Sequence, residues 1–269
     1  MIHVIKATGK AEPYSEEKLI QSIKRAGIAG SLENQVVSHV QEKLYDDIPT
    51  SVIYHHVKEY LKHSSQPYTS AKYSLKQAIM DLGPTGYPFE DYIAHIMQSE
   101  GFTTTVRNIV RGMCITHEID VIATRGMEKV MVEAKFHNFA GTKTNVHVAM
   151  YTKARFEDTK KANAFTTPWL VTNTKMTSDA IAFGGCCDMH ILSWEYPTGH
   201  NFRDIVEKAR LIPITALNSL NHTQKTQLLA LGAVLTKDVV NNHSILATLH
   251  LPAHRIEDVL VEAKQLVEN

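Results

Sequence analysis

Three ionisable residues interrupt a stretch that otherwise has the composition of two buried strands. Residues 117–136, HEIDVIATRGMEKVMVEAKF, contain two apolar runs joined by a glycine-containing turn. Asp120 lies between apolar neighbours in the first run, and the spacing of Glu133 and Lys135 in the second places both side chains on one face of a strand. Burying an unpaired ion costs several kcal/mol, roughly, so these residues require either partners or a function.

The residue types indicate metal-assisted chemistry on a phosphate. Carboxylate oxygens are ligands that Mg²⁺ or Mn²⁺ prefers, and we expect Asp120 and Glu133 to bind such an ion. Lys135 would then align and polarise an attacking water, or offset charge on the phosphate. A structural salt-bridge cluster is the alternative, because perturbed ionisable groups mark functional sites only statistically. Context matters, since the same tetrapeptide, Val-Glu-Ala-Lys, recurs at residues 261–264 within a helical apolar spacing.

The elements around this stretch follow the order helix, three strands, helix, strand. Apolar spacing predicts helices at residues 88–100 and 145–162, and extended segments at 102–111 and 168–171 in addition to the two central strands. In the first central strand Ile119, Val121 and Ala123 alternate, and in the second Val130, Val132, Ala134 and Phe136 do so, which predicts one apolar face for each.

This arrangement resembles the PD-(D/E)xK motif of Mrr-type restriction endonucleases, with Asp120 in HEIDVIA and Glu133-x-Lys135 in VEAKF. The resemblance implies an αβββαβ core that hydrolyses DNA phosphodiester bonds, with Asp120 and Glu133 as metal ligands and Lys135 as a catalytic residue. Superfamily members often add an acid from the leading helix, here Glu90, and a Gln from the second helix, where this chain has His147. A favourable acid in a first helical turn and a polar edge residue are the alternative interpretations of Glu90 and His147.

A second motif lies near the N-terminus. Residues 4–23 follow the pattern V-x-K-x-x-G-x-x-x-x-Y-x-x-x-K-L-x-x-S-I, in which two short extended pieces precede helical runs. This pattern resembles the ATP-cone domain, a β-hairpin with a small helical bundle. The resemblance implies contacts with bound ATP or dATP from four positions, Val4, Lys6, Lys10 and Lys18. Ala7 replaces the family's usual Arg, a bidentate phosphate donor, so a module that has lost its ligand is the alternative.

The last part of the chain has helical patterns only. Leu228-x-x-Leu231-Gly232 before a helix led by Thr236 resembles a helix-hairpin-helix, which offers backbone amides to DNA phosphates. Residues 202–269 carry seven basic and seven acidic residues, so they lack the positive excess that phosphate binding favours. We therefore favour a packing or dimerisation module.

Breaks rich in Gly and Pro divide the chain into three expected domains. They are an ATP-cone nucleotide-binding domain (1–83), an Mrr-like nuclease domain (84–198) and a small helical C-terminal domain (199–269). The predicted fold class is thus a multi-domain combination of α+β and α/β parts. The three cysteines are interpreted as buried small apolar residues, with no disulfide framework or zinc spacing. No apolar run reaches the ~18 residues of a membrane span and no signal peptide is evident, so we expect a cytoplasmic protein without membrane contact.

These observations lead to one functional hypothesis and one alternative. The hypothesis is a Mg²⁺-dependent DNA endonuclease of restriction, defence or repair, regulated by ATP or dATP, and a homodimer because one site cuts one strand. Net charge is zero, but residues 137–175 carry six basic and two acidic residues, which suits either a DNA backbone or a solvated helix face. The alternative is a non-catalytic, nucleotide-responsive regulator that binds DNA or changes oligomeric state.

Overall fold

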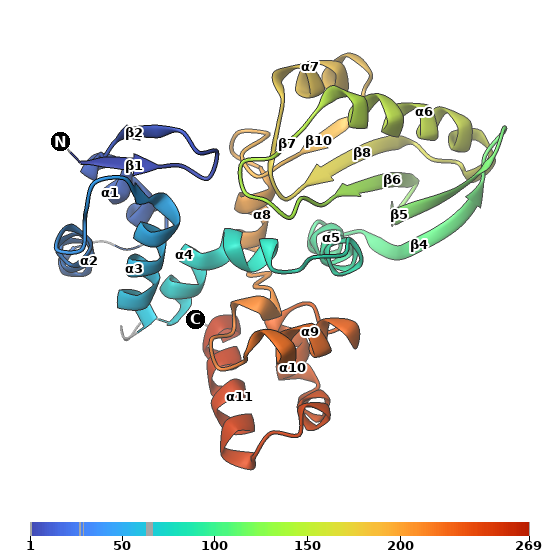
Figure 1. Ribbon diagram of the computed structural model, residues 1–269. Coiled ribbons are helices and arrows are strands. Elements are labelled where there is room, and N and C mark those ends of the chain that lie inside the picture. Colours follow the sequence, from blue (N-terminus) through green and yellow to red (C-terminus); the bar gives the residue numbers. More distant parts are fainter. Residues whose placement is uncertain (1, 27, 29, 63–66, 269) are drawn as a thin grey trace.

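The chain forms a small N-terminal body, a larger sheet-containing body and a helical C-terminal part, with one helix, α4, running between the first and the other two (Figure 1). The structure is a computed structural model, and it describes residues 2–26, 28, 30–62 and 67–268. Among these residues, no helix combines the length and apolar character that crossing a bilayer requires.

The N-terminal body is a three-stranded sheet with helices packed on it. Its elements are β1 (His3–Ile5), β2 (Ala11–Pro13), α1 (Glu16–Arg25), α2 (Ser31–Gln41), β3 (Ile48–Pro49) and α3 (Thr50–Lys62). β1 and β2 form an antiparallel hairpin, and β3 pairs with β1 in parallel. The side chain of Ser15 accepts the backbone N–H of Lys18 and caps the start of α1. The hairpin and helical bundle expected from the sequence are confirmed.

The larger body is built on a five-stranded sheet in the order β10-β8-β6-β5-β4. Its elements are α5 (Tyr87–Ser99), β4 (Thr103–Arg111), β5 (Thr116–Arg125), β6 (Glu128–Lys135), β7 (Lys143–Thr144), α6 (Val146–Asn163), β8 (Thr167–Thr172), β9 (Lys175–Met176), α7 (Ser178–Cys186) and β10 (His190–Leu192). β4, β5 and β6 form an antiparallel meander, and β8 and β10 continue the sheet in parallel with β6. Helices α6 and α7 cover one face and α5 lies on the other (Figure 1), which confirms the predicted αβββαβ order.

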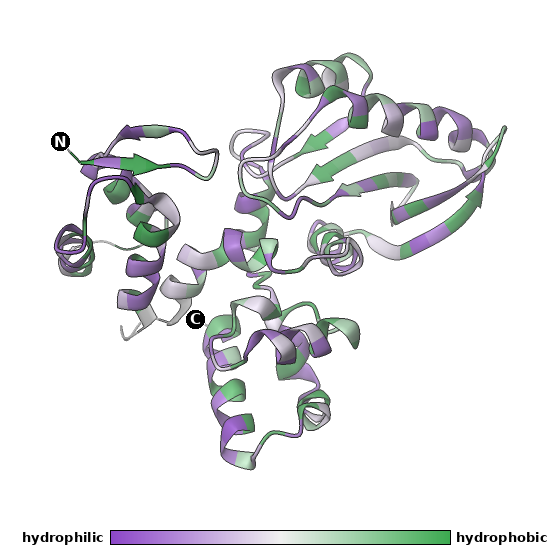
Figure 2. Cartoon of the chain, in the orientation of Figure 1, coloured by the Kyte–Doolittle hydropathy of each residue, from purple (hydrophilic) through white to green (hydrophobic). Residues whose placement is uncertain are grey.

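The alternation of side chains along β6 explains this layering. Val130, Val132 and Ala134 pack on the α5 side of the sheet, in a core that also contains Tyr92. Met131 points the other way and packs with Phe156 of α6. Figure 2 shows the resulting hydrophobic stretches along the sheet strands. Glu133 and Lys135 have the same parity as Met131, so both lie on the α6 side, as the spacing predicts.

The expected single apolar face of β5 is wrong at one position. Val121 and Ala123 pack on the α5 side, but Ile119 packs with Met131 on the α6 side. The alternation therefore inverts at Asp120. An irregular backbone on the neighbouring strand accompanies this inversion and is described with the site below.

The C-terminal helices share a hydrophobic core with the sheet. Their bounds are α8 (Phe202–Lys208), η1 (Ile214–Ala216), α9 (His222–Ala230), α10 (Thr236–Asn241), η2 (His243–Leu249) and α11 (Ala253–Glu268). The hydroxyl of Tyr92 in α5 donates to the carbonyl of Leu211 over 2.6 Å, which joins the two parts inside that core. Helix α4 (Pro67–Met80) inserts Leu75 and Ile79 into the same core.

One further expectation concerns the three cysteines. Cys114 and Cys186 are exposed and Cys187 is half-buried, so their interpretation as buried apolar residues is wrong. Cys114 lies in the tip of the β4–β5 hairpin, where no core is available to cover it.

The turn between α9 and α10 has the connectivity expected of a helix-hairpin-helix, but its amide groups are engaged within the chain. The carboxylate of Asp238 accepts the backbone N–H groups of Val234 and Leu235 over 2.9 and 2.8 Å. Donors of this kind are the ones that would otherwise face a phosphate. The geometry therefore fits the favoured packing module better than a phosphate-binding turn.

Candidate functional site

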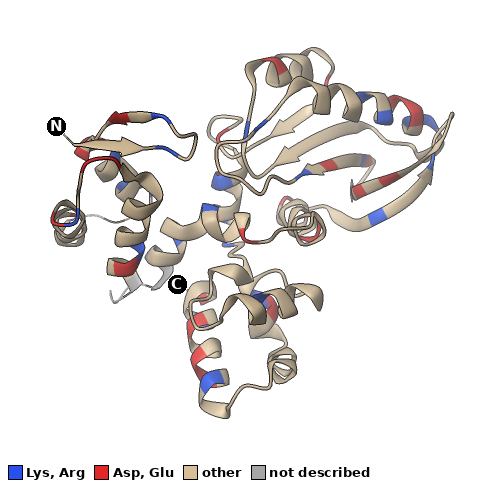
Figure 3. Ribbon diagram, in the orientation of Figure 1, with Lys and Arg blue, Asp and Glu red and all other residues tan. Residues whose placement is uncertain are grey.

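The site begins where the β5–β6 ladder stops. The last paired residues are Val121 and Val132, and the next positions along the two strands are Asp120, just before Val121, and Glu133, just after Val132 (Figure 3 shows acidic positions in red on both strands). Beyond this point the N–H of Ala134 donates to the Asp120 carboxylate over 2.7 Å instead of to a strand partner. A buried amide must find an acceptor, so this bond fixes the orientation of the Asp120 side chain.

Glu133 is held by an arginine of the covering helix. Its Oε2 atom lies 2.5 Å from Nη1 of Arg155, and the two side chains are only 15% and 14% exposed. Burial, reinforced by the charge of Asp120, raises the pKa of Glu133 to about 7, although Arg155 and Lys135 pull it down. Burial likewise raises the pKa of Asp120. The neighbouring positive charges thus do not fully offset the cost of burying these two carboxylates in their charged form, in spite of the ion pair.

Glu90 joins these two carboxylates from the opposite side. It lies in the first turn of α5, its side chain is 13% exposed, and its Oε2 atom is 3.3 Å from Nη1 of Arg107. Burial and the charge of Asp120 raise the pKa of Glu90 to about 7. Glu90 in turn contributes to the raised pKa of Glu133. The structure therefore brings Glu90, Asp120 and Glu133 into one electrostatic cluster.

Lys135 belongs to the same cluster. It lies two residues after Glu133 in β6 and is half-buried. Its ammonium group lowers the pKa of both Asp120 and Glu133, so it is close enough to act on both carboxylates. The three residues selected from the sequence are therefore neighbours in space.

Arg107 closes the cluster on the β4 side. Its backbone has φ +52°, which is uncommon for a residue other than glycine, and it lies opposite Asp120 in a ladder that pairs Val106 with Val121 and Asn108 with Ile119. Its guanidinium group also contacts Asp91 over 2.8 Å. Strained backbone of this kind is concentrated at functional sites.

The donor set suits a hard divalent cation. Three carboxylates contributed by α5, β5 and β6 offer oxygen ligands, and their raised pKa values show that ionising all of them is costly without added positive charge. Each carboxylate has a second oxygen besides the one that its arginine or amide partner occupies. The residues present therefore fit the Mg²⁺ or Mn²⁺ that the sequence predicts.

His147 lies apart from this cluster. It is in the exposed first turn of α6, where its backbone N–H donates to the Asn145 cap, and no described contact joins its imidazole to the carboxylates. The residue of α6 that reaches them is Arg155, which the sequence reasoning did not select. The helix spacing carries one signal: His147, Tyr151 and Arg155 are four residues apart and so lie on one face of α6. Arg107 had no comparable signal.

A cleft of about 640 Å³ opens beside the cluster. On one side it is lined by Tyr87, Asp91 and Arg107, and on the other by Thr226 and Gly232 of the C-terminal helices. The C-terminal part therefore supplies one wall of a cleft whose other wall carries Arg107, the partner of Glu90. Tyr87 is 58% exposed and its ring lies 5.7 Å from the Arg107 guanidinium, so an aromatic face and a positive charge are presented together.

A separate cavity of about 260 Å³ lies in the N-terminal body. Val4, Lys18 and three tyrosines line it, and the rings of Tyr54 and Tyr73 stack 5.3 Å apart. The buried hydroxyl of Tyr14 has no hydrogen-bond partner among the described residues, so it is available to a ligand. An aromatic cavity with an unpaired hydroxyl fits a nucleotide base.

The three lysines expected at the nucleotide have different surroundings. Lys6 and Lys18 both form ion pairs with Glu12, over 2.8 and 2.9 Å. Lys10 lies in the exposed turn of the hairpin, where its carbonyl accepts the N–H of Lys6. Glu12 thus pairs with two of the three lysines that are expected at a phosphate.

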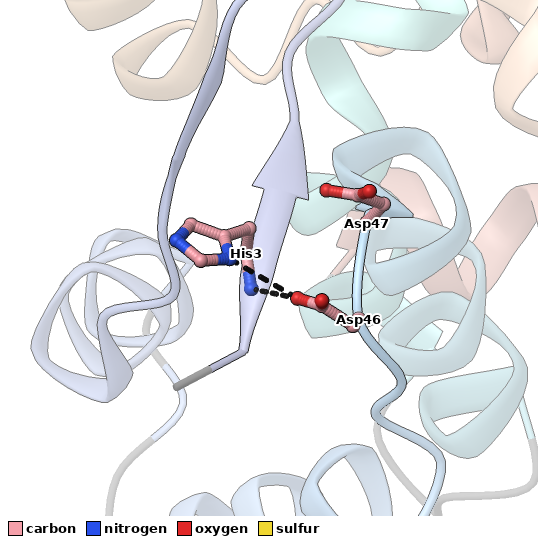
Figure 4. Close-up of side chains that lie close together, drawn as sticks. All are labelled: His3, Asp46 and Asp47. Carbon is pink, nitrogen blue, oxygen red and sulfur yellow. Dashed lines mark hydrogen bonds and ion pairs between the residues drawn. The ribbon is translucent and has the colours of Figure 1, made fainter.

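An exposed cluster of metal-ligand types also lies at the start of the chain (Figure 4). Candidate ligand atoms of His3, Asp46 and Asp47 lie within 4.8 Å of one another. Asp46 accepts both the backbone N–H and Nδ1 of His3, over 2.8 and 3.1 Å. These bonds attach β1 to the segment before β3, which accounts for the cluster without an ion.

Three protein-family models match successive parts of the chain. A model described as the ATP cone domain matches residues 2–81, and one described as restriction endonuclease matches residues 84–192. A third, described as AF1548-like, C-terminal, matches residues 213–267.

One sequence relative and one solved structure each match about two thirds of the chain. An uncharacterized protein of Archaeoglobus fulgidus is 36% identical over 176 residues, which cover 65% of this chain and 99% of that protein. The crystal structure of AF1548, a protein of unknown function, superposes on the chain with a TM-score of 0.60 and 35% identity, covering 68% of this chain and 98% of that chain.

Proposed function

The chain belongs to the AF1548-like family, and we propose that it is a divalent-metal-dependent DNA endonuclease whose activity responds to ATP or dATP. The presence of a restriction endonuclease domain and an ATP-cone domain in one chain agrees with a nuclease family. The observation that carries the proposal is the cluster of Glu90, Asp120 and Glu133, with Lys135 beside it.

Each residue of the cluster has a distinct role in the proposed reaction. Asp120 and Glu133 would bind the metal, with Glu90 as a further carboxylate from α5. A bound Mg²⁺ or Mn²⁺ would polarise the phosphate and lower the pKa of the attacking water. Lys135 would donate hydrogen bonds to that water or to a phosphate oxygen and offset the charge that develops there. The Ala134 amide keeps the Asp120 carboxylate in position throughout.

We place the DNA strand in the cleft between Arg107 and the C-terminal helices. Arg107 can bind a phosphate with its guanidinium group, and the exposed ring of Tyr87 can stack on a base. One site hydrolyses one strand, so cutting both strands requires two copies, and we propose a homodimer. The mass of the protein in solution, measured with and without DNA, tests whether this homodimer forms.

Helix α4 is the proposed connection between nucleotide and nuclease. Tyr73 of α4 lines the N-terminal cavity, whereas Leu75 and Ile79 pack in the core shared by the sheet and the C-terminal helices. A short segment then leads to α5, whose first turn carries Glu90. A nucleotide held against Tyr73 would therefore act on the site through a continuous packed helix.

Cleavage of plasmid and linear DNA with Mg²⁺ or Mn²⁺ tests this proposal. We expect Asp120→Ala and Lys135→Ala each to reduce the single-turnover rate by about 10²-fold or more, as losses of charge-stabilising groups do. The matched control is Lys264→Ala, because it alters the second Val-Glu-Ala-Lys at an exposed position of α11. Activity that survives both site variants would place the chemistry elsewhere. A dependence of the rate on ATP that Tyr73→Ala abolishes would support the role of α4.

One observation favours the non-catalytic alternative. Arg155 and Arg107 already pair with Glu133 and Glu90, so the carboxylates are partly neutralised within the chain. The same experiment separates the two functions. A parent protein that binds DNA or changes mass with ATP but cuts no substrate would be a regulator.

A further inference from the structure

Arg155 of α6 combines several contacts within the fold with one donor that has no partner among the described residues. Its guanidinium group bridges three elements, with Nη1 contacting Glu133 of β6 over 2.5 Å and the carbonyl of Glu118 of β5 over 3.3 Å. Nη2 contacts the hydroxyl of Tyr151 in α6 over 2.9 Å. The buried Nε atom has no hydrogen-bond partner among the described residues. Arg155 is therefore attached firmly to its surroundings, yet it retains an unused donor.

The contact with Glu133 competes with metal binding. Arg155 Nη1 occupies Oε2 of Glu133, which leaves the other Glu133 oxygen for a cation. A divalent cation bound there would lie close to the guanidinium group and repel it. Metal binding at Glu133 therefore weakens the Arg155 contact and favours its displacement.

Tyr151 limits how far Arg155 can move. The guanidinium carbon lies 4.7 Å from the Tyr151 ring centre, and the Tyr151 side chain is 56% exposed at the surface beside the site. Stacking and the bond to the Tyr151 hydroxyl do not involve Glu133. A released Arg155 would thus stay at the entrance of the site, with Nη1 and Nε both available.

We propose that Arg155 is an exchangeable counterion of the site: it pairs with Glu133 in the absence of metal and binds the substrate phosphate once a divalent cation replaces it. This inference rests on the proposed nuclease function and assigns Arg155 a role in both metal affinity and turnover. Guanidinium groups match phosphate oxygens in a bidentate manner, which suits this second partner. The exchange places the positive charge on the phosphate only when the metal is present.

The two roles predict opposite effects of one substitution. Arg155→Gln removes the competitor at Glu133, so we expect about tenfold tighter Mn²⁺ binding by titration calorimetry without DNA. The same variant lacks the phosphate contact, so single-turnover cleavage at saturating Mn²⁺ should fall about 10²-fold. Arg155→Lys keeps the charge but not the planar fork, so its Mn²⁺ affinity should stay near that of the parent and its cleavage rate should fall about tenfold. Arg111→Gln, at an exposed position of β4, is the matched control and should change neither quantity.

The outcomes separate this inference from the nuclease proposal. If the parent cuts DNA but Arg155→Gln binds Mn²⁺ no more tightly, or cuts at the parental rate, the exchange is refuted and the nuclease stands. If Arg155→Gln loses Mn²⁺ affinity together with thermal stability, its role is structural and the inference is also refuted. If neither the parent nor any variant cuts DNA, the nuclease proposal fails and the phosphate half of the inference fails with it. Should Arg155→Gln not fold, an unchanged cleavage rate in Arg155→Lys refutes the phosphate contact.

Discussion

Replacing Glu133 by Gln should make the metal-free protein less sensitive to rising pH. Burial and the neighbouring Asp120 raise the pKa of Glu133 to about 7 in the fold, against an ordinary value of 4.5. The other charged groups that act on it are Lys135 and Arg155, which lower this pKa, and Glu90, which raises it. Gln has nearly the same shape and cannot ionise, so it isolates the cost of placing a charge at this position.

The sign follows from the direction of the shift. Because the folded-state pKa lies above the unfolded-state value, the folded protein binds more protons than the unfolded chain between about pH 4.5 and about pH 7. Stability contributed by protonated Glu133 is therefore complete below the unfolded-state pKa and is lost as the pH rises through the folded-state pKa. A metal-free parent protein should weaken over this window, and the Gln variant should not share that loss.

The magnitude can be worked from the two pKa values. Integrating the linkage relation between about pH 5.5 and about pH 8.5 gives a loss of roughly 2 kcal/mol in the free energy of unfolding for one such group. The Gln variant also leaves Arg155 without its partner, but that guanidinium is charged throughout the window, so its effect largely cancels from the difference between the two pH values.

Urea denaturation of both proteins at the two pH values in EDTA measures the effect. We expect the parent to lose roughly 2 kcal/mol more than Glu133→Gln between them. Excess Mg²⁺ at the higher pH should restore the stability of the parent and have a much smaller effect on the variant, because the ion replaces the missing positive charge. Parallel pH profiles for the two proteins would show that Glu133 is ionised at no cost, which would remove the electrostatic argument for a metal at this position.

Two further substitutions test the proposed nucleotide site and the junction between α4 and α5. Glu12→Gln should tighten ATP binding by titration calorimetry, because it frees Lys6 and Lys18 from their shared ion pair; an unchanged affinity would place the phosphates elsewhere. Gly83→Ala should lower the free energy of unfolding by about 1–3 kcal/mol in urea denaturation, because its Cβ would lie 2.7 Å from the Phe136 ring; unchanged stability would mean that this junction yields easily.

Strand periodicity is sufficient to select the central residues of the candidate site. Asp120, Glu133 and Lys135 could be selected because they are charged positions in apolar strands, and their order in the chain places them on neighbouring strands. The tetrapeptide by itself was not informative. Its second copy lies in α11, where Glu262 accepts the amides of Asn218 and Ser219 over 2.7 and 2.8 Å.

Long-range pairing was not accessible from the sequence in the same way. Arg155 and Arg107 reach their partners across 22 and 17 residues of chain, respectively, through the packing of α6 on the sheet and the irregular backbone of β4 at Arg107. Local patterns carry no information about which helix face meets a given strand position. Glu90 was identified only through the family resemblance, because an acid in a first helical turn is common for other reasons. The shared core around α4 was missed because the Gly- and Pro-rich break after it marks a turn in the chain but not the end of a packed unit.

The irregularity at Asp120 explains why this position can serve the site at all. In a regular strand Asp120 would share a face with Ile122, on the α6 side, and would point away from α5. Instead, β4 and β5 both invert their apolar faces here, since Val106 and Val121 pack on the α5 side while Val110 and Ile119 pack on the α6 side. Arg107, at φ +52°, and Asp120 occupy the crossing point. As a result the Asp120 charge acts on Glu90 from α5 and on Glu133 on the α6 side. The irregular backbone at Arg107 and Asp120 thus allows Asp120 to act on Glu90 and on Glu133, which lie on opposite faces of the sheet.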